Sequence, residues 1–217
     1  ELNMKPDDVT FVAVSHTHGD HVGNVDLFPK STLLIQKAEV DWAFAEGKTP
    51  PFKKDRPTKL LEGDLDVFGD GSVVILSAPG HTPGHQVLQV RLAKTGYVVL
   101  TGDLAHFHEN YESNGVPNFN SDRAQTLASL DRFKKIAANL KATVIIQHDQ
   151  RDIAKLPAFP NAARLCPQRW LAFLWTDWSR QAAITRSAGW PSAATASPCS
   201  ARYRPIPTRA PIGSRSA

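Results

Sequence analysis

Short apolar runs, separated by segments rich in polar residues, glycine and proline, fill the first 160 or so positions of the chain. Several of these runs are rich in Val, Ile, Leu, Phe and Thr and are bounded by turn-forming residues, a pattern typical of buried strands. We expect strands at 9–14, 31–36, 65–68, 72–77, 86–92, 97–101 and 143–147.

The clearest helical pattern runs from about residue 122 to residue 140, where apolar side chains recur three or four positions apart and form one face. These side chains are Leu127, Leu130, Phe133, Ala137 and Leu140. Asn118 and Asn120 precede the helix, and we expect Asn120 or Ser121 to cap it. Shorter helices are expected at 21–28 and 38–46. Strands and helices without strict alternation predict layered sheets covered by helices.

The composition changes near residue 165. In residues 165–217, Ala, Ser, Pro and Arg make up 30 of 53 residues, lysine is absent, and no helical or strand period persists. Such a segment is expected to have little order. It is either a basic arm for an acidic partner or a non-native extension, and the composition favours the extension. We therefore predict one domain over 1–164 and a low-order tail over 165–217.

The charge of the chain is also divided between these parts. Residues 1–164 hold 18 Lys and Arg against 20 Asp and Glu, a net charge of −2, so the chain's net charge of +4 comes from a tail with a net charge of +6. A nearly neutral domain gives no electrostatic reason to expect a nucleic-acid substrate. No apolar run is long enough to cross a bilayer, so no membrane partner is expected. Both cysteines lie in the tail, which excludes thiolate ligands from the domain.

Histidine and aspartate residues gather in four short clusters, each at the end of an expected strand. The clusters are His16-Thr-His-Gly-Asp-His21, Gly80-His-Thr-Pro-Gly-His85, Thr101-Gly-Asp-Leu-Ala-His-Phe-His108 and Gln147-His-Asp149. On a strand, residues two apart point the same way, so His16 and His18 can hold one ion, while Asp20 and His21 face a second position. Imidazole and carboxylate ligands suit zinc, and also iron, manganese or cobalt.

In these clusters the sequence resembles the metallo-β-lactamase superfamily, in its dinuclear hydrolase branch. The resemblance rests on the His16–His21 motif, Gly80-His81, Asp103 and His148. Within the superfamily, residues 79–86, 101–104, 117–122 and 147–149 are most similar to N-acyl homoserine lactonases. The resemblance covers roughly residues 5 to 160 and implies an α+β fold, the αββα four-layer sandwich.

The resemblance also implies a role for each motif residue. His16, His18 and His81 would hold one divalent ion, Asp20, His21 and His148 a second, and Asp103 would bridge them. His85 would then be a supporting residue that orients a ligand. His106 stands where several lactonases have a tyrosine that contacts the substrate carbonyl.

The expected activity is the opening of a lactone ring, as in quorum quenching, by attack of a hydroxide that bridges two metal ions. His106 could donate a hydrogen bond to the carbonyl oxygen, and Asp20 could pass a proton to the departing alkoxide, which makes both candidate catalytic residues. Phe107, Tyr111 and Phe119 are candidates for lining an acyl-chain pocket, although such aromatic residues more often serve ordinary packing.

Other readings stay open. The same motif also occurs in β-lactamases, thioesterases and organophosphate hydrolases of this fold. In the interpretation that we favour, the substrate is a small lactone or ester. Relatives also carry strands before the first motif, so we expect a domain truncated at its N-terminus, and an inactive metal-binding fragment is an alternative of another class. A cytoplasmic location and a homodimer are expectations from the resemblance alone.

Overall fold

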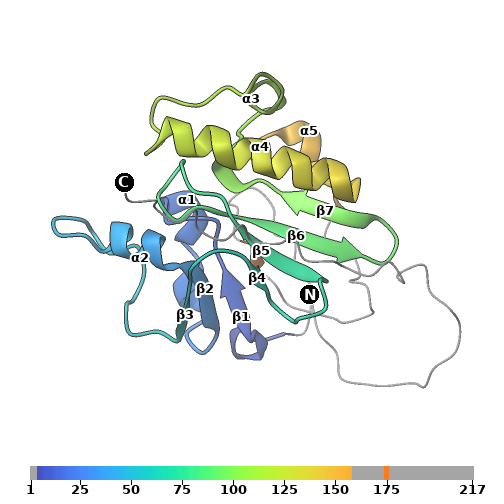
Figure 1. Cartoon of the computed structure of the whole chain (residues 1–217). Helices are drawn as coiled ribbons and strands as arrows, with labels where there is room; N and C mark the ends of the chain where they lie inside the picture. The colour runs from blue at the N-terminus through green and yellow to red at the C-terminus, as the bar shows by residue number, and fades with distance from the viewer. Residues whose placement is uncertain (1–3, 158–173, 176–217) are drawn as a thin grey trace, which may run out of the picture.

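The computed structural model describes residues 4–157 and the strand at 174–175 (Figure 1). The strands are β1 (Phe11–Ala13), β2 (Thr32–Gln36), β3 (Thr58–Leu61), β4 (Leu65–Asp66), β5 (Val73–Ser77), β6 (Gln86–Leu92), β7 (Gly96–Leu100), β8 (Thr143–Ile145) and β9 (Leu174–Trp175). The helices are α1 (Gly19–Val22), α2 (Lys37–Ala43), α3 (His108–Ser113), α4 (Arg123–Leu140) and α5 (Gln150–Ile153), and the 3-10 turns are η1 (Pro6–Asp8), η2 (Val25–Leu27) and η3 (Gly102–Leu104).

The strands form two sheets in the part of the chain that the structure describes. The first has the order β3-β2-β1-β9 and is parallel throughout, while the second has the order β4-β5-β6-β7-β8. In the second sheet all neighbours are antiparallel except β7 and β8, which run parallel. As a result β5, β7 and β8 point in one direction, and their carboxyl ends lie along one edge of the sheet.

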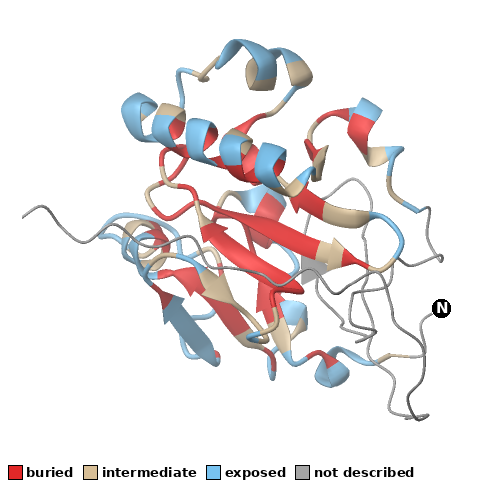
Figure 2. Ribbon diagram, turned by 45° about the vertical axis from the view of Figure 1, so that its right-hand side comes forward, coloured by how far each residue is buried: buried red, intermediate tan, exposed pale blue. Residues whose placement is uncertain are grey.

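The central strands of both sheets are buried on both faces, as their red ribbons in Figure 2 show, whereas the edge strand β3 is mostly exposed. Because neighbouring side chains on a strand point to opposite faces, Val73 and Ile75 of β5 enter the core between the sheets, and Val74 and Leu76 enter a second core under α4. A third core, with Val12 of β1, lies on the outer face of the first sheet. The described residues therefore form four layers, and the predicted αββα sandwich is confirmed.

The two sheets are tied together beside the site by Gln86, a fully buried residue at the start of β6. Its side-chain amide donates to the carbonyl oxygens of Val14 and Leu34, at 2.8 and 3.0 Å, and its amide oxygen accepts from Gln36 at 3.1 Å. Val14, Leu34 and Gln36 belong to the first sheet or follow its strands, so one side chain of the second sheet spans the gap.

The N-cap of helix α4 lies one residue beyond Ser121 and two beyond Asn120, the caps we predicted. Asp122 is the N-cap, and its carboxylate accepts the backbone N–H of Gln125 at 2.9 Å. The prediction that Asn120 or Ser121 caps this helix is therefore wrong, because the Asn120 side chain is engaged elsewhere. The apolar face that we predicted does pack on the second sheet, through Leu130, Phe133 and Ala137.

Elements that the apolar pattern did not predict are β3, α3 and α5. Strand β3 lies at the edge of its sheet and leaves three of its four residues exposed, and α3 contains no buried residue. Helix α5 has only four residues. Such elements carry too little apolar periodicity to be recognised. The predicted strands were placed correctly but were one or two residues too long at several ends, and β7 begins one residue before its predicted start.

The predictions for residues 165–217 lie outside the described residues, apart from β9, whose backbone pairs in parallel with β1. The division into a domain of residues 1–164 and a tail therefore stays a prediction. Among the described helices, none combines the length and the apolar character needed to cross a membrane.

Candidate metal centre

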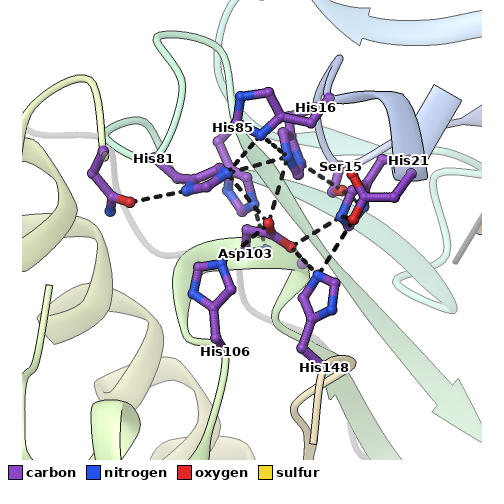
Figure 3. Close-up of polar contacts among 12 residues, drawn as sticks. Ser15, His16, His21, His81, His85, Asp103, His106 and His148 are labelled. Atoms are coloured by element: carbon purple, nitrogen blue, oxygen red, sulfur yellow. Dashed lines mark hydrogen bonds and ion pairs between the residues drawn. The ribbon is translucent and has the colours of Figure 1, made fainter. Parts of the chain in front are cut away.

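The four histidine and aspartate clusters follow the carboxyl ends of four strands, and the fold brings these ends together (Figure 3). Residues 15–21 follow β1, residues 78–85 follow β5, residues 101–106 follow β7, and residues 147–149 follow β8. Since β5, β7 and β8 run in one direction, their loops leave the same edge of the second sheet. The first cluster joins them because the backbone N–H of Gln86 donates to the Ser15 carbonyl oxygen at 2.9 Å.

One group of side chains consists of His16, His18, His81 and Asp103, and one ligand atom from each lies within 4.8 Å of all the others. The ring nitrogens of the three histidines are 2.9 to 3.2 Å apart, measured from His16 Nε2, His18 Nδ1 and His81 Nε2. His16 and His81 are almost completely buried, and His18 is half-buried. The structure thus brings together three histidines that the sequence separates by up to 65 positions.

A second group consists of Asp20, His21 and His148. His21 Nε2 lies 3.3 Å from Asp20 Oδ2, and His148 Nε2 lies 3.8 Å from the same oxygen. His21 is buried, whereas the side chain of Asp20 is 48% exposed. This second group therefore lies at the open side of the cluster, where Asp20 can meet solvent.

Asp103, which was counted with the first group, also contacts the second group. Its two carboxylate oxygens face different groups. Oδ2 is 3.6 Å from His16 Nε2 and 3.3 Å from His81 Nε2. Oδ1 is 3.1 Å from His21 Nε2 and 3.0 Å from His148 Nε2. One carboxylate thus touches both groups, one oxygen to each.

The protonation states of these groups suit metal binding. Burial lowers the pKa of His16 well below its ordinary value, and burial lowers that of His81 to about 4, so both rings are neutral near pH 7. Burial alone would raise the pKa of Asp103, but hydrogen bonds with His106, His148 and His21 hold it far below its ordinary value. Neutral imidazoles and an ionised carboxylate are the forms that bind divalent cations.

The donor set fits a pair of divalent ions. Each of these ring nitrogens is either a donor or an acceptor, so three that face one another at about 3 Å cannot all be paired by hydrogen bonds. A cation shared by these nitrogens satisfies all of them, and nitrogen with oxygen ligands suits zinc. The described part of each loop contains no cysteine, so thiolate takes no part in this set.

Asn120 supports the first group, a role that our sequence analysis missed. Its Oδ1 lies 3.0 Å from His81 Nδ1, and its Nδ2 donates to Thr126 Oγ1 at 3.1 Å. With Nδ1–H of His81 donating to the amide oxygen, Nε2 keeps its lone pair and points toward His16 and His18. The only signal in the sequence was a polar loop before a helix, which indicated capping instead.

Glu39, on α2, is a second supporting residue that the sequence analysis missed. It is fully buried, and its Oε1 accepts the backbone N–H and the hydroxyl of Thr17 at 2.8 and 2.7 Å. Its Oε2 accepts the backbone N–H of Gly84 at 2.9 Å. Thr17 lies between His16 and His18, and Gly84 follows His81 by three residues. One carboxylate therefore fixes both loops that supply the histidines of the first group.

His85 belongs to neither group, but it supports Asp103. Its Nδ1 lies 3.1 Å from the Ala78 carbonyl oxygen, to which it can only donate, so Nε2 accepts the backbone N–H of Asp103 at 3.0 Å. Beside it, Gln147 Oε1 accepts the backbone N–H of Gly102 at 2.6 Å. These two contacts fix the turn η3, which presents the Asp103 carboxylate.

His106 lies at the mouth of the cluster with its Nε2 3.3 Å from Asp103 Oδ2, and its ring stacks on that of His148 at 5.4 Å and 17°. The exposed ring of Phe119 contacts the rings of His81 and His106 at 5.8 and 5.6 Å. Of the three aromatic residues considered for an acyl-chain pocket, Phe119 is therefore beside the cluster.

The other two aromatic residues make no ring contact with the histidines of the cluster that the described structure shows. Tyr111 packs edge-on against Phe133 of α4, at 6.2 Å between ring centroids, and belongs to the core under that helix. Phe107 is 50% exposed.

An open pocket of about 310 Å³ adjoins the first cluster and is lined by Thr17, Trp42, Ala43, Lys48, Thr49 and Pro51. The Trp42 ring contacts that of His18 at 5.9 Å, so the pocket reaches the cluster.

Known proteins are similar to this chain in sequence. An N-acyl homoserine lactonase AttM of Azorhizobium caulinodans is 34% identical over 160 residues, covering 68% of this chain and 61% of that protein. An N-acyl homoserine lactonase of a Bacillus species is 34% identical over 162 residues, covering 74% of this chain and 64% of its own length. The chain thus spans under two thirds of the length of these relatives.

Solved structures agree with the sequence relatives. An N-acyl homoserine lactone hydrolase with the product N-hexanoyl-L-homoserine bound at its catalytic metal centre is 30% identical, with a TM-score of 0.67 over 73% of this chain and 63% of that one. AidC, a dizinc quorum-quenching lactonase, has a TM-score of 0.52 at 21% identity and shows the likeness of the fold.

The profile of the Metallo-beta-lactamase superfamily matches residues 1–148, which include every residue of the two groups. The match covers well over half of the chain and ends at His148. On the fold, the strand-end clusters and this match, the chain belongs to the metallo-beta-lactamase superfamily.

Proposed function

We propose that this chain is the greater part of a dinuclear, zinc-dependent N-acyl homoserine lactonase. The observation that carries the proposal is the position of Asp103, whose oxygens face His16 and His81 on one side and His21 and His148 on the other. A carboxylate so placed suits two ions a few ångströms apart. The lactonase relatives named above support the choice of substrate.

In this proposal His16, His18 and His81 would hold one ion, Asp20, His21 and His148 would hold the other, and Asp103 would contribute to both sites. Two bound divalent ions would supply Lewis-acid activation of water and of the substrate carbonyl. Zinc is the ion that this nitrogen and oxygen set favours, with iron, manganese and cobalt as metals that could replace it.

The protein's own groups supply the remaining steps of ring opening. His106 lies at the mouth of the cluster, where its ring can donate a hydrogen bond to the carbonyl oxygen as negative charge develops there. Asp20 is at the solvent side of the second group and can return a proton to the alkoxide that leaves the ring. No side-chain nucleophile is needed, because water attacks the carbonyl carbon.

The acyl chain of the substrate has an apolar surface available at Phe119, whose ring is 62% exposed and stands against His81 and His106. Burying an aromatic face that is otherwise exposed favours binding of an alkyl chain. A lactone with an acyl chain therefore matches this side of the cluster better than a small unsubstituted ester does.

The test combines metal analysis with a comparison of substrates. Purified protein should contain two divalent ions per chain and should hydrolyse an N-acyl homoserine lactone faster than nitrocefin or a thioester. Asp103→Asn should lose both the metal and the activity, whereas Asp131→Asn, at an exposed position of α4, should keep both.

Each other outcome identifies a different alternative. Preferred turnover of nitrocefin or of the thioester would indicate another hydrolase of the same fold. Two bound ions without turnover of any of these substrates would indicate a metal-binding fragment without catalysis. Protein without bound metal after loading with zinc would contradict the proposed centre itself.

A further inference from the structure

Ser15 is a buried serine that contacts one histidine of each group. It follows β1 directly, is 2% exposed, and is fixed by the hydrogen bond from the Gln86 backbone to its carbonyl oxygen. Its Oγ lies 3.0 Å from His16 Nδ1 and 2.8 Å from His21 Nδ1. His16 belongs to the first group and His21 to the second, so a single hydroxyl joins the two.

The two contacts are made on the far side of each ring from the cluster. His16 and His21 both direct Nε2 toward Asp103, at 3.6 and 3.1 Å, and both direct Nδ1 toward Ser15. For Nε2 to offer a lone pair to a metal, the ring hydrogen must lie on Nδ1. Both rings must then donate to the same Ser15 oxygen, which has two lone pairs to receive them.

The hydroxyl of Ser15 can also act as a donor, but only to one ring at a time. If it donates to Nδ1 of either histidine, that ring must carry its hydrogen on Nε2, where it points into the cluster and opposes a cation. The state in which both histidines are ready to bind is therefore the one in which Ser15 accepts twice.

We propose that Ser15 is a positioning residue that sets the tautomers of His16 and His21 together and so couples the two metal sites. The proposal rests on the proposed function, since it requires both groups to bind metal. With hydrogen on His16 Nδ1, that ring no longer offers an acceptor to the Ser15 hydroxyl, and His21 is ready to bind metal only if the hydroxyl does not donate to its Nδ1 either. The state of one site therefore depends on that of the other.

The experiment titrates metal-free protein with Co²⁺ and Zn²⁺ in competition with a chromophoric chelator, using the full chain and its Ser15→Ala variant. We expect the variant to bind both ions about 10- to 100-fold more weakly, the range usual for loss of a group that orients a metal ligand. Cooperativity between the two ions should also fall. Ser31→Ala is the matched control, because Ser31 is fully buried and its hydroxyl donates to the Val9 carbonyl oxygen far from the cluster.

Nuclear magnetic resonance of the histidine rings in the unaltered, zinc-loaded chain gives a second measurement that does not depend on the variant folding. Both His16 and His21 should show hydrogen on Nδ1, protected from exchange with solvent. Hydrogen on Nε2 of either ring would overturn the proposal.

Equal affinities of the Ser15→Ala variant and the unaltered chain for both ions would also overturn it, while leaving the proposed metal centre in place. Weakening of one site alone would overturn the coupling. If the unaltered chain bound fewer than two ions, both the coupling and the dinuclear centre would fail, which separates this outcome from the others.

Discussion

The backbone N–H of Gly84 donates to Oε2 of Glu39 at 2.9 Å, although the two residues are 45 positions apart. The contact is possible because the loop comes very close to α2. A Cβ atom on Gly84 would lie 2.2 Å from the backbone nitrogen of Glu39 and 2.6 Å from its Cα. The glycine therefore allows the carboxylate to reach both loops that carry the first histidine group.

Replacing Gly84 by alanine should destabilise the protein, since the clash is with backbone atoms that cannot turn aside. We expect a loss of about 1–3 kcal/mol in the free energy of unfolding, the usual range for overpacking. Urea denaturation of metal-free protein measures it. Gly19→Ala is the control, because a Cβ there has no neighbour within 4 Å. Equal stability of the two variants would show that the loop has room to move.

Replacing Glu39 by glutamine should weaken metal binding at the first group more than at the second. The Thr17 and Gly84 groups that contact the carboxylate are all donors, so the amide NH₂ group of glutamine would face a donor. Both loops of the first group would then shift. Stepwise metal titration should show a loss of about 10-fold or more for one ion. A uniform loss at both sites would argue against this selective role.

Replacing His106 by leucine should reduce turnover and leave metal content unchanged. In our proposal this ring stabilises charge on the carbonyl oxygen, and loss of one such donor costs about 100-fold in kcat. Steady-state kinetics with a lactone, together with metal analysis of the same sample, tests the prediction. If kcat stayed the same and only KM rose, His106 would be a binding residue instead.

Metal-free protein should lose stability as the pH falls. Burial lowers the pKa of His85 to about 3 and that of His81 to about 4, from an ordinary value of 6.5. Below about pH 6.5 the unfolded chain binds protons that the folded chain does not, so unfolding is increasingly favoured down to about pH 3. Asp103 changes the stability in the same direction as the histidines, because folding also lowers its pKa. Urea midpoints at successive pH values should decline over this range, and a flat profile would contradict the prediction.

Zinc should raise the melting temperature, and a chelator should lower it. An ion that binds only the folded chain stabilises it by about 2.7 kcal/mol for each site when free zinc is 100 times the dissociation constant. Differential scanning fluorimetry with and without chelator measures the shift. The Asp103→Asn variant should show little of it. An equal shift in this variant would indicate zinc binding elsewhere in the chain.

The sequence predicted the architecture well where side chains repeat with a clear period. Strand β5, which enters two cores, was predicted from an uninterrupted apolar run, and helix α4 from apolar residues three or four positions apart. Strand β3 was missed because it is an edge strand with a mostly exposed face, and α3 because it buries nothing. Apolar patterning reports burial, so elements that bury little leave no signal.

The motifs also indicated which residues meet in the candidate centre, because each stands at a strand end and the resemblance assigned each a partner. The supporting residues could not be found this way. Glu39 lies on a helix where an acidic residue is ordinarily exposed, and Asn120 lies in a loop where it indicates a cap. Their roles depend on contacts across 45 and 39 positions of sequence, which no local pattern encodes.

Gln86 carries no charge at any ordinary pH, and its three amide contacts reach the backbone or side chains of the opposite sheet. Acid or high salt can therefore disturb the histidines and carboxylates of the centre without directly weakening the hydrogen bonds of Gln86 between the two sheets. As long as the protein stays folded, loss of metal and of activity under such conditions should therefore be reversible, because the contacts that join the two sheets beside the site are unchanged.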